Sequence, residues 1–288
     1  MDITLLLTNL LYGVTIGSAL ILISSGLSLT FGVMGVLNFA HGGLCMLGAY
    51  VGYSFVIWTG NFWLALLLAP CVIALLGAAM EMFTIRPLYG LNPLYQLLLT
   101  VGLSMVFANA VLLIWGADQL GLDLPSYFRG YVDLYGIYYP KFRLFVLIFS
   151  SFLAVVLWLV ITRTRWGIVI RAGIHDIETV SAYGINIKRV FTIVFALGSG
   201  LAAIAGVIIG AMRALNPEMD LELLTSALIV VVIGGMGSFQ GAVIGSLLLG
   251  VTEAFGAQFF TGAAKFTVWG LMILVLIFRP EGLLGETK

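Results

Sequence analysis

The polar side chains of this chain that could do chemistry are few, and most of them lie inside long apolar runs. Asn38 and His41 stand three residues apart in FGVMGVLNFAHGG, and Glu253 interrupts another apolar stretch. A further set recurs every four residues, which places it on one face of a helix: Gln96, Thr100 and Ser104. Polar and ionisable groups in such surroundings are candidates for lining a pathway through a membrane.

Each candidate also has a purely structural interpretation. Asn38 and His41 could cap a helix or hydrogen-bond a neighbouring helix instead. Glu253 could make a structural hydrogen bond. Glu81 precedes Arg86 by a little over one helical turn, so we expect these two side chains to pair or to reach for the membrane surface. The sequence leaves the pathway and structural interpretations of Asn38, His41 and Glu253 open.

The sequence does not support a catalytic site or a metal site. A metal site needs several His, Cys or carboxylate ligands together, whereas the other histidine, His175, lies in a separate charged segment. Cys45 and Cys71 lie in different apolar runs, and we predict small buried packing residues. Ser104 has no histidine nearby in sequence to act as its base. The chain also lacks the GxxxxGK[ST] sequence that holds nucleotide phosphates. We expect no catalytic residues, no metal and no cofactor.

The composition determines where such a chain can fold. Of its 288 residues, 61% are hydrophobic and 9% are charged, the formal net charge is zero, and the mean hydropathy is +1.15. A soluble domain carries about 25% charged residues. The chain therefore cannot cover a surface that faces water, and we predict one integral membrane domain over residues 1–288, surrounded by a lipid bilayer. The neutral balance gives no indication of nucleic acid as a partner.

The apolar runs are long enough to cross that bilayer. A spanning helix needs about 20 apolar residues, and windows of this size predict an all-α, polytopic bundle of eight or nine transmembrane helices. The predicted spans cover residues 5–31, 43–60, 62–84, 92–116, 143–162, 190–212, 222–237, 240–258 and 265–279. The first has no basic segment before it, so we interpret it as an uncleaved span rather than a signal peptide.

Basic residues in the loops predict the orientation. The densest Lys and Arg segment, residues 163–190, should be cytoplasmic. Alternating spans then place the loops 117–142 and 213–222 outside, the N-terminus outside and the C-terminus in the cytoplasm. This arrangement requires an odd number of crossings, so one segment is re-entrant if the number of spans is eight.

Glycine marks both the contacts between helices and the places where helices break. Small residues recur every four positions at Gly13/Gly17, Gly48/Gly52 and Gly198/Ala202/Gly206/Gly210, which favours close helix packing in lipid. Two segments near opposite ends of the chain share the pattern Gly-x-Met-Gly, at 32–35 and 234–237. The glycines expected to break the two segments are Gly32, Gly35, Gly42, Gly235, Gly237 and Gly241.

Backbone that leaves the helix at membrane depth needs protein or water to satisfy its polar groups. Corresponding glycine-broken segments in two parts of a chain indicate a transport pathway. We therefore predict that 31–43 breaks so that its backbone and Asn38 face a translocation path. No charged pair stands in these segments, so we expect a partly wet path rather than a tight binding site.

The segment DIETVSAYGINIKR within the basic loop 163–190 predicts a short helix. Asp176 and Glu178 would lie near its positive end, and Gly184 near its C-terminus. The small residues Ala182 and Gly184 would let a soluble partner approach closely. The alternative is an ordinary connecting loop anchored at the lipid headgroups.

Four sequences stand in the order and spacing of a known family: FGVMGVLNFAHGG, TRTRWG followed by IRA and GIN, VVVIGGMGSFQGAVIG, and FRPEGLLG. The chain thereby resembles, over essentially its whole length, the LivH-type permeases, the membrane subunits of branched-chain amino-acid ABC importers. Departures from that pattern are Ile168, where many members have a polar residue, and Thr225 and Ser226, where many have a lysine nearby.

The resemblance implies a multi-pass permease of a bacterial inner membrane that translocates branched-chain or related apolar amino acids. It implies four kinds of contact: a second homologous permease subunit, two ATPase subunits, a periplasmic solute-binding protein, and lipid. Residues 176–186 would be the coupling helix, with Asp176, Glu178, Ala182 and Gly184 facing an ATPase. The alternatives are a permease of the same family for urea, amides or other amino acids, and an ion-coupled secondary transporter whose ion site would depend on Glu253.

The external loops are the remaining polar segments. We expect the regions around Asp118, Asp123 and Asp133, together with 216–222, to receive the solute-loaded binding protein. Their acids, including Asp220 and Glu222, would mainly set the rate of encounter.

Overall fold

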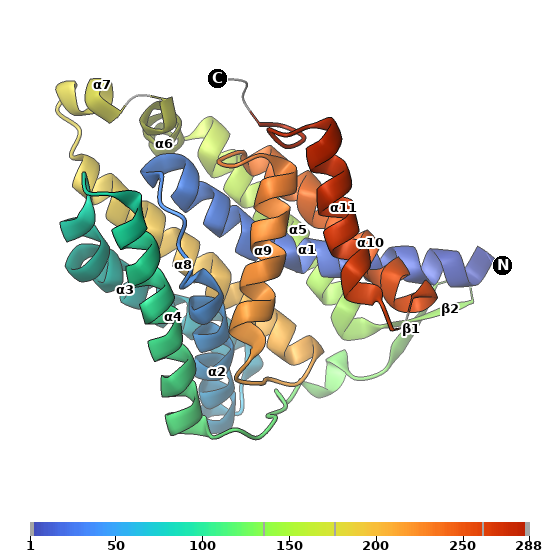
Figure 1. Cartoon of the computed structure of the whole chain (residues 1–288). Helices are drawn as coiled ribbons and strands as arrows, with labels where there is room; N and C mark the ends of the chain where they lie inside the picture. The colour runs from blue at the N-terminus through green and yellow to red at the C-terminus, as the bar shows by residue number, and fades with distance from the viewer. Residues whose placement is uncertain (1–2, 135, 176, 261, 286–288) are drawn as a thin grey trace.

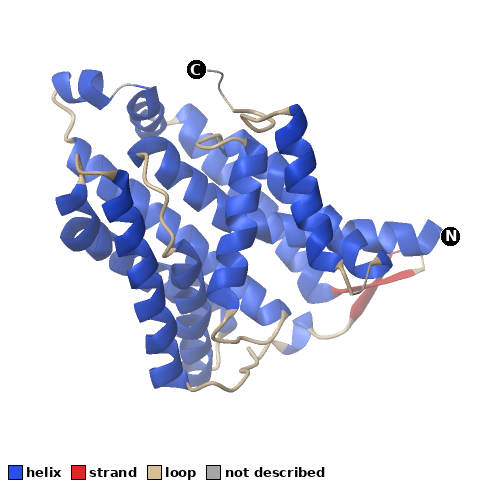
Figure 2. Cartoon of the chain, viewed as in Figure 1, coloured by secondary structure: helices blue, strands red, loops and turns tan. Residues whose placement is uncertain are grey.

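The apolar runs of the sequence form helices in the computed structural model, which describes residues 3–134, 136–175, 177–260 and 262–285, apart from the side chains of 173–179. The nine long helices of the described residues are α1 (Ile3–Met34), α2 (His41–Thr59), α3 (Phe62–Met80), α4 (Pro93–Trp115), α5 (Lys141–Arg163), α8 (Ile187–Met212), α9 (Met219–Gly234), α10 (Phe239–Phe259) and α11 (Ala264–Phe278). They pack side by side (Figures 1 and 2). Each coincides with one predicted span.

Shorter elements join these helices. They are the π-helix η1 (Glu81–Ile85), the 3₁₀ turns η2 (Arg86–Leu88) and η3 (Ser126–Phe128), the helices α6 (Arg165–His175) and α7 (Ile177–Ala182), and the strands β1 (Tyr131–Leu134) and β2 (Ile137–Pro140). The two strands pair antiparallel, with Tyr131 opposite Pro140. The sequence did not predict this hairpin. The buried Tyr139 fastens it to α1, because its hydroxyl donates to the Leu11 carbonyl at 3.1 Å.

Length and composition divide the helices into two groups. Among the described residues, seven helices are long and apolar enough to cross a membrane, and α11 is a shorter apolar helix. The helix α9 is also short, at 16 residues, and carries Asp220 and Glu222 in its first turn. The prediction of a polytopic, all-α membrane bundle of about eight or nine helices is confirmed.

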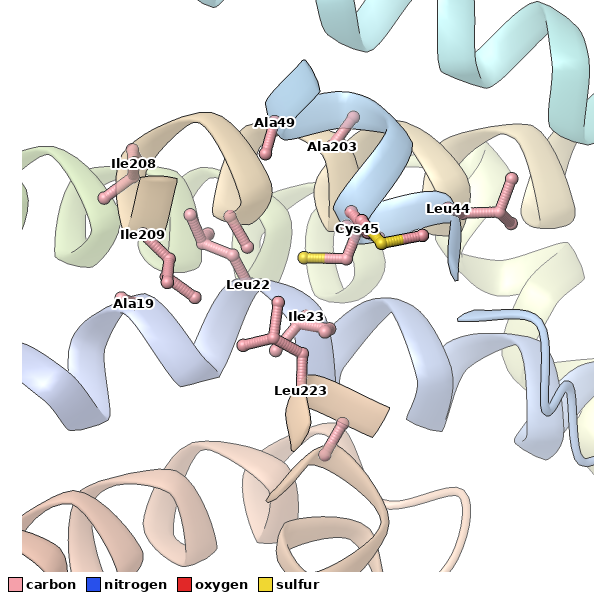
Figure 3. Close-up of a cluster of buried hydrophobic side chains, with 14 of the residues drawn as sticks. Ala19, Leu22, Ile23, Leu44, Cys45, Ala49, Ala203, Ile208, Ile209 and Leu223 are labelled. Carbon is pink, nitrogen blue, oxygen red and sulfur yellow. The ribbon is translucent and has the colours of Figure 1, made fainter. Parts of the chain in front are cut away.

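The centre of the bundle is formed by α1 and α8, which pack against each other. α1 also contacts α10 and α5, and α8 also contacts α3 and α2. Their shared core contains Leu22 and Ile23 of α1, Cys45 of α2 and Ile208 of α8, which are among the buried side chains drawn in Figure 3. Large apolar side chains on the outer faces are exposed, such as Phe83 and Leu113. An apolar outer surface of this kind is the surface that lipid covers.

Glycines bring these helices together as the small-residue pattern predicts. A side chain on Gly206 of α8 would overlap the backbone oxygen of Cys45 in α2, and one on Gly48 would overlap Ala203. A side chain on Gly250 of α10 would meet the backbone of α1 at Gly13 and Gly17. Because lipid supplies little hydrophobic drive between helices, this close approach is a main source of their association.

The first glycine-broken segment is a genuine break that turns back into the bundle. α1 ends at Met34, and Gly35 has a φ of +66° that favours glycine. At its far end the His41 ring donates from Nε2 to the Ile23 carbonyl at 2.9 Å. Ile23 lies 11 residues before Met34, which is about 16 Å along the helix. α2 therefore begins inside the bundle, at the lower end of the chain segment that descends from the end of α1 in Figure 1.

The second broken segment is a tight turn between α9 and α10. Gly235 and Gly237 have φ values of +101° and +84°. The C-terminal segment packs against this turn, where Leu283 donates its N–H to the Ile233 carbonyl at 2.8 Å. A side chain on Gly237 would lie 3.1 Å from the Gly32 Cα, so the two Gly-x-Met-Gly sequences are in contact.

Some positions predicted from the sequence lie elsewhere. Gly32, Gly42 and Gly241 are inside α1, α2 and α10 rather than in breaks, and the close contacts of Gly42 and Gly241 explain why they lack side chains. Cys45 is buried as predicted. The prediction for Cys71 is wrong, because its side chain is exposed on the outer face of α3.

The close contact of α8 with α2 can be tested by adding one methyl group. Gly206→Ala should lower stability by about 1–3 kcal/mol, because overpacking forces the two helices apart. Thermal unfolding of the purified protein in detergent or lipid measures the effect. Gly102→Ala is the matched control: it lies within α4 with no atom within 4 Å of the added group, so it should stabilise by up to about 1 kcal/mol. Equal behaviour of the two variants would contradict the packing argument.

Candidate functional site

The start of α2 is a buried polar junction deep in the bundle. Asn38 is 1% exposed, and its Oδ1 accepts the Ala40 N–H at 3.0 Å. His41 is fully buried and bonded to α1 through Ile23. Both side chains thus hydrogen-bond backbone groups and stabilise the break. These contacts fit the structural interpretation given for them from the sequence.

Two further helices meet the first turn of α2. Gly42 packs against the Asp220 backbone oxygen in α9, and a side chain on Gly43 would lie 3.5 Å from the Ser104 Oγ in α4. Ser104 in turn donates to the Asp220 carboxylate at 3.3 Å. The structure therefore brings Ser104 close to the Asn38–His41 segment, which sequence spacing alone does not show.

Asp220 also belongs to this buried junction, contrary to the prediction from the sequence. We expected it in an exposed external patch, but it is 6% exposed. Its position in the first turn of α9 lets the helix dipole favour its charge. An acid immediately before an apolar run, at a helix start, was the signal that could have identified it.

The other two polar residues of α4 satisfy backbone groups. Thr100 is fully buried and donates to the Gln96 carbonyl at 3.0 Å. The Gln96 amide donates to the Leu88 carbonyl at 3.1 Å, which ties α4 to the turn before it. These contacts are structural, and Gln96 lies apart from Ser104 along the helix.

A second polar cluster surrounds Glu81, where α3 continues as the π-helix η1. Arg86 donates to Glu81 at 3.2 and 2.7 Å, which confirms the predicted pair. Tyr89 and Thr192 also donate to the same carboxylate, at 2.7 and 2.8 Å. Burial is the largest cause that raises the pKa of Tyr89, so its hydroxyl stays a donor. Glu81 is fully buried, and four hydrogen bonds offset the cost of burying its charge.

The Glu81 cluster stands beside the charged loop. Thr192 is in the second turn of α8, and α8 begins directly after this loop. Within the loop, Gly184 has a φ of +79° and donates its N–H to the Ser181 carbonyl, while the Asn186 side chain caps α8. The predicted helix is α7, ending at Ala182. Asp176 and the side chain of Glu178 lie outside the described residues.

Two cavities open at the end of the bundle opposite α6 and α7. The larger, of about 1080 Å³, lies between the ends of α9, α10 and α11 and is lined by Glu222, Glu253 and Lys265. The smaller, of about 560 Å³, is lined by Asp123, Arg129 and the start of α3. Glu253 thus belongs to a cavity and not to the junction around His41. Among the described residues, no three His, Cys, Asp or Glu side chains gather as a metal site.

An apolar bundle of spanning helices, one of which breaks and restarts inside it, with a cavity open at one end, defines a polytopic α-helical membrane permease. The sequence matches the family described as "Branched-chain amino acid transport system / permease component" over residues 9–278. The chain belongs to this family.

Related permeases match along nearly the whole chain. The "High-affinity branched-chain amino acid transport system permease protein BraD" of Pseudomonas aeruginosa is 33% identical over 98% of this chain and 96% of that protein. The permease protein LivH of Escherichia coli K12 is 31% identical over the same shares. A solved structure, "PsaBC from Streptococcus pneumoniae in complex with Fab", has the same fold: 94% of this chain aligns with 91% of that one at a TM-score of 0.52 and 10% identity.

The different surroundings of two acids in α9 give a direct test of the junction. Asp220→Lys should destabilise the protein by about 3 kcal/mol or more, because it buries a cation against Ser104. Glu222→Lys should change stability little, since this side chain is 43% exposed. Yield and thermal unfolding of the two variants measure the contrast. If the two substitutions cost the same, Asp220 is not part of a buried junction.

Proposed function

We propose that this chain is the permease subunit of an ATP-binding-cassette importer in a bacterial inner membrane, and that it translocates branched-chain or related apolar amino acids. The observation that supports this proposal most strongly is the match, over nearly the full length of both chains, to proteins named as branched-chain amino acid transport permeases. The helical bundle with a deep break and an open cavity is consistent with a transport path.

The proposed partners are a second homologous permease, two ATPase subunits and a periplasmic solute-binding protein. The family description of a transport system with a permease component supports a multi-subunit assembly. The basic segment that contains α6 and α7 favours a cytoplasmic position for that end of the bundle. The cavities would then face the periplasm, where a solute-binding protein delivers its ligand.

The predicted pathway residues receive different roles in this proposal. Asn38, His41 and Thr100 are enclosed within the subunit, so we assign them to holding the broken segment and α4 in place. Ser104 joins them through Asp220. Glu253 lines the open cavity and remains the candidate for contact with solute.

The proposed coupling surface is residues 176–186, within the loop 163–190. Ala182 and Gly184 are exposed, and Tyr183 presents an aromatic ring that is 83% exposed. An exposed aromatic side chain is a common anchor at protein interfaces. The Glu81 cluster joins the start of α8, just after this loop, to the end of α3, so movement of the loop would reach two core helices.

An ion-coupled secondary transporter is the second candidate, because Glu253 is an ionisable group in a spanning helix beside a cavity. Uptake of radiolabelled leucine by vesicles that contain the purified assembly distinguishes the two. The importer should transport leucine only with ATP and the binding protein present, and should be unaffected when the ion gradient is collapsed. Leucine uptake without ATP, driven by an imposed ion gradient, would exclude the importer.

The coupling surface should tolerate neither charge nor truncation if it binds an ATPase. Ala182→Asp and Tyr183→Ala should each reduce copurification of the ATPase subunits about tenfold, the effect of losing one interface anchor. Solute-stimulated ATP hydrolysis should fall in parallel, while the two permeases stay paired.

Trp58→Ala is the matched control, because Trp58 is an aromatic residue of similar exposure at the opposite end of the bundle. It should leave ATPase association unchanged. Gly184→Val is less informative, because the φ of +79° strains any side chain there regardless of docking. Normal ATPase association in both loop variants would remove this surface from the mechanism.

A further inference from the structure

The larger cavity is lined by faces of α9, α10 and α11, which lie side by side in Figure 1, together with Leu112 of α4 and residues of the loops that follow α4 and α8. On α9 the lining residues are spaced as one helical face, at Leu221, Thr225 and Ile229 with their neighbours Glu222 and Ser226. On α10 they are Glu253 and Ala257, and on α11 they are Lys265, Val268 and Trp269, again one turn apart. Three helices thus supply most of the lining, and the two loops complete it.

The cavity carries both signs of charge. Glu218, Glu222 and Glu253 contribute carboxylates, and Lys265 contributes an ammonium group. Arg213, which is not itself a lining residue, pairs with Glu222 at 3.3 Å. Three acids and two bases therefore lie at one end of an otherwise apolar bundle, although they come from separate parts of the sequence between residues 213 and 265. The sequence does not predict that these charged residues share one cavity, because they belong to no single motif.

Two hydroxyl groups extend the acidic side of the cavity. Thr225 donates to the Leu221 carbonyl at 2.7 Å, and Ser226 donates to the Glu222 carbonyl at 3.1 Å. Because each hydroxyl hydrogen is used within the helix, the oxygens present acceptor lone pairs to the cavity. Acceptors of this kind suit an ammonium ligand.

The remaining walls are mainly apolar, apart from the amides of Gln119 and Asn216. Ile229, Val268 and Trp269 face the same space as the charges. A ligand with an ammonium group, a carboxylate and an aliphatic side chain would match this cavity. Its ammonium group would meet the acids, its carboxylate the bases, and its side chain the apolar wall. The volume of about 1080 Å³ lies just above the usual range of ligand pockets, roughly 300–1,000 Å³. A single amino acid would therefore keep part of its water, as a site of passage requires.

We propose that this cavity receives the zwitterionic amino acid on its way through the permease. Glu222, Glu253 and the two hydroxyls face the ammonium group, Lys265 and Arg213 face the carboxylate, and Ile229, Val268 and Trp269 contact the side chain. The proposal rests on the proposed function and adds the contacts that the solute makes with this chain.

The test separates solute contact from assembly and from docking. Wild-type and variant permeases are reconstituted with both ATPases, the second permease and the binding protein, and leucine transported per ATP hydrolysed is measured. Glu253→Gln and Lys265→Gln should each lower this ratio about tenfold, the factor for one charged hydrogen bond, with ATP hydrolysis still stimulated by the loaded binding protein. Glu253→Asp and Lys265→Arg should restore most of the ratio.

Asp123→Asn is the matched control, because Asp123 lines the smaller cavity at the same end of the bundle. If this variant weakens docking of the binding protein, ATP hydrolysis and leucine transport should fall together. The amount of leucine transported per ATP hydrolysed should then stay at the wild-type value. Thr225→Val, which keeps the side-chain volume, should lower the ratio about threefold, since one neutral hydrogen bond is weaker than a charged one.

An unchanged ratio in Glu253→Gln and Lys265→Gln overturns the proposal. So does loss of the second permease from either variant on copurification, because the cavity would then be a subunit interface. Absence of ATP-dependent leucine uptake by the wild-type assembly is a different failure, since it contradicts the proposed function before any variant is compared.

Discussion

The absence of a hydrophobic drive between helices in lipid is the constraint that organises this fold. Association must come from contact area and from polar groups satisfied inside the bundle. Glycines supply the contact: α1 approaches α10 at Gly13 and Gly17, and α2 approaches α8 at Gly206. With the central helices held this closely, a helix can end inside the bundle without exposing its backbone to lipid.

The break after α1 depends on that packing. Its backbone runs back along α1, where Ile23 accepts a hydrogen bond from His41, and Asn38 satisfies the N–H of Ala40. Asp220 and Ser104 complete the surroundings of the restarted helix. We therefore assign Asn38 and His41 to holding this backbone at depth. The position of α2 follows from them, and α2 in turn positions the neighbouring α9, whose opposite face borders the cavity.

The sequence predicts local features well because they depend on nearby residues. Apolar run lengths predict every long helix, and four-residue glycine spacing predicts which faces pack. Gly184 predicts the turn that follows α7. The sequence does not predict contacts between distant segments: Thr192 joining Glu81, Gly237 meeting Gly32, or Lys265 sharing a cavity with Glu253. It also misplaced Cys71 and Asp220, because the direction in which a helical residue points depends on neighbours that periodicity does not identify.

The two departures from the permease pattern now have places in the fold. Ile168 lies on α6, 59% exposed beside the proposed coupling surface, whereas Thr225 and Ser226 line the charged cavity. A hydroxyl in place of a lysine lowers the positive charge of that cavity and leaves acceptors for a cationic group. If the solute crosses there, its ammonium group meets a more favourable wall in this chain than it would beside a lysine.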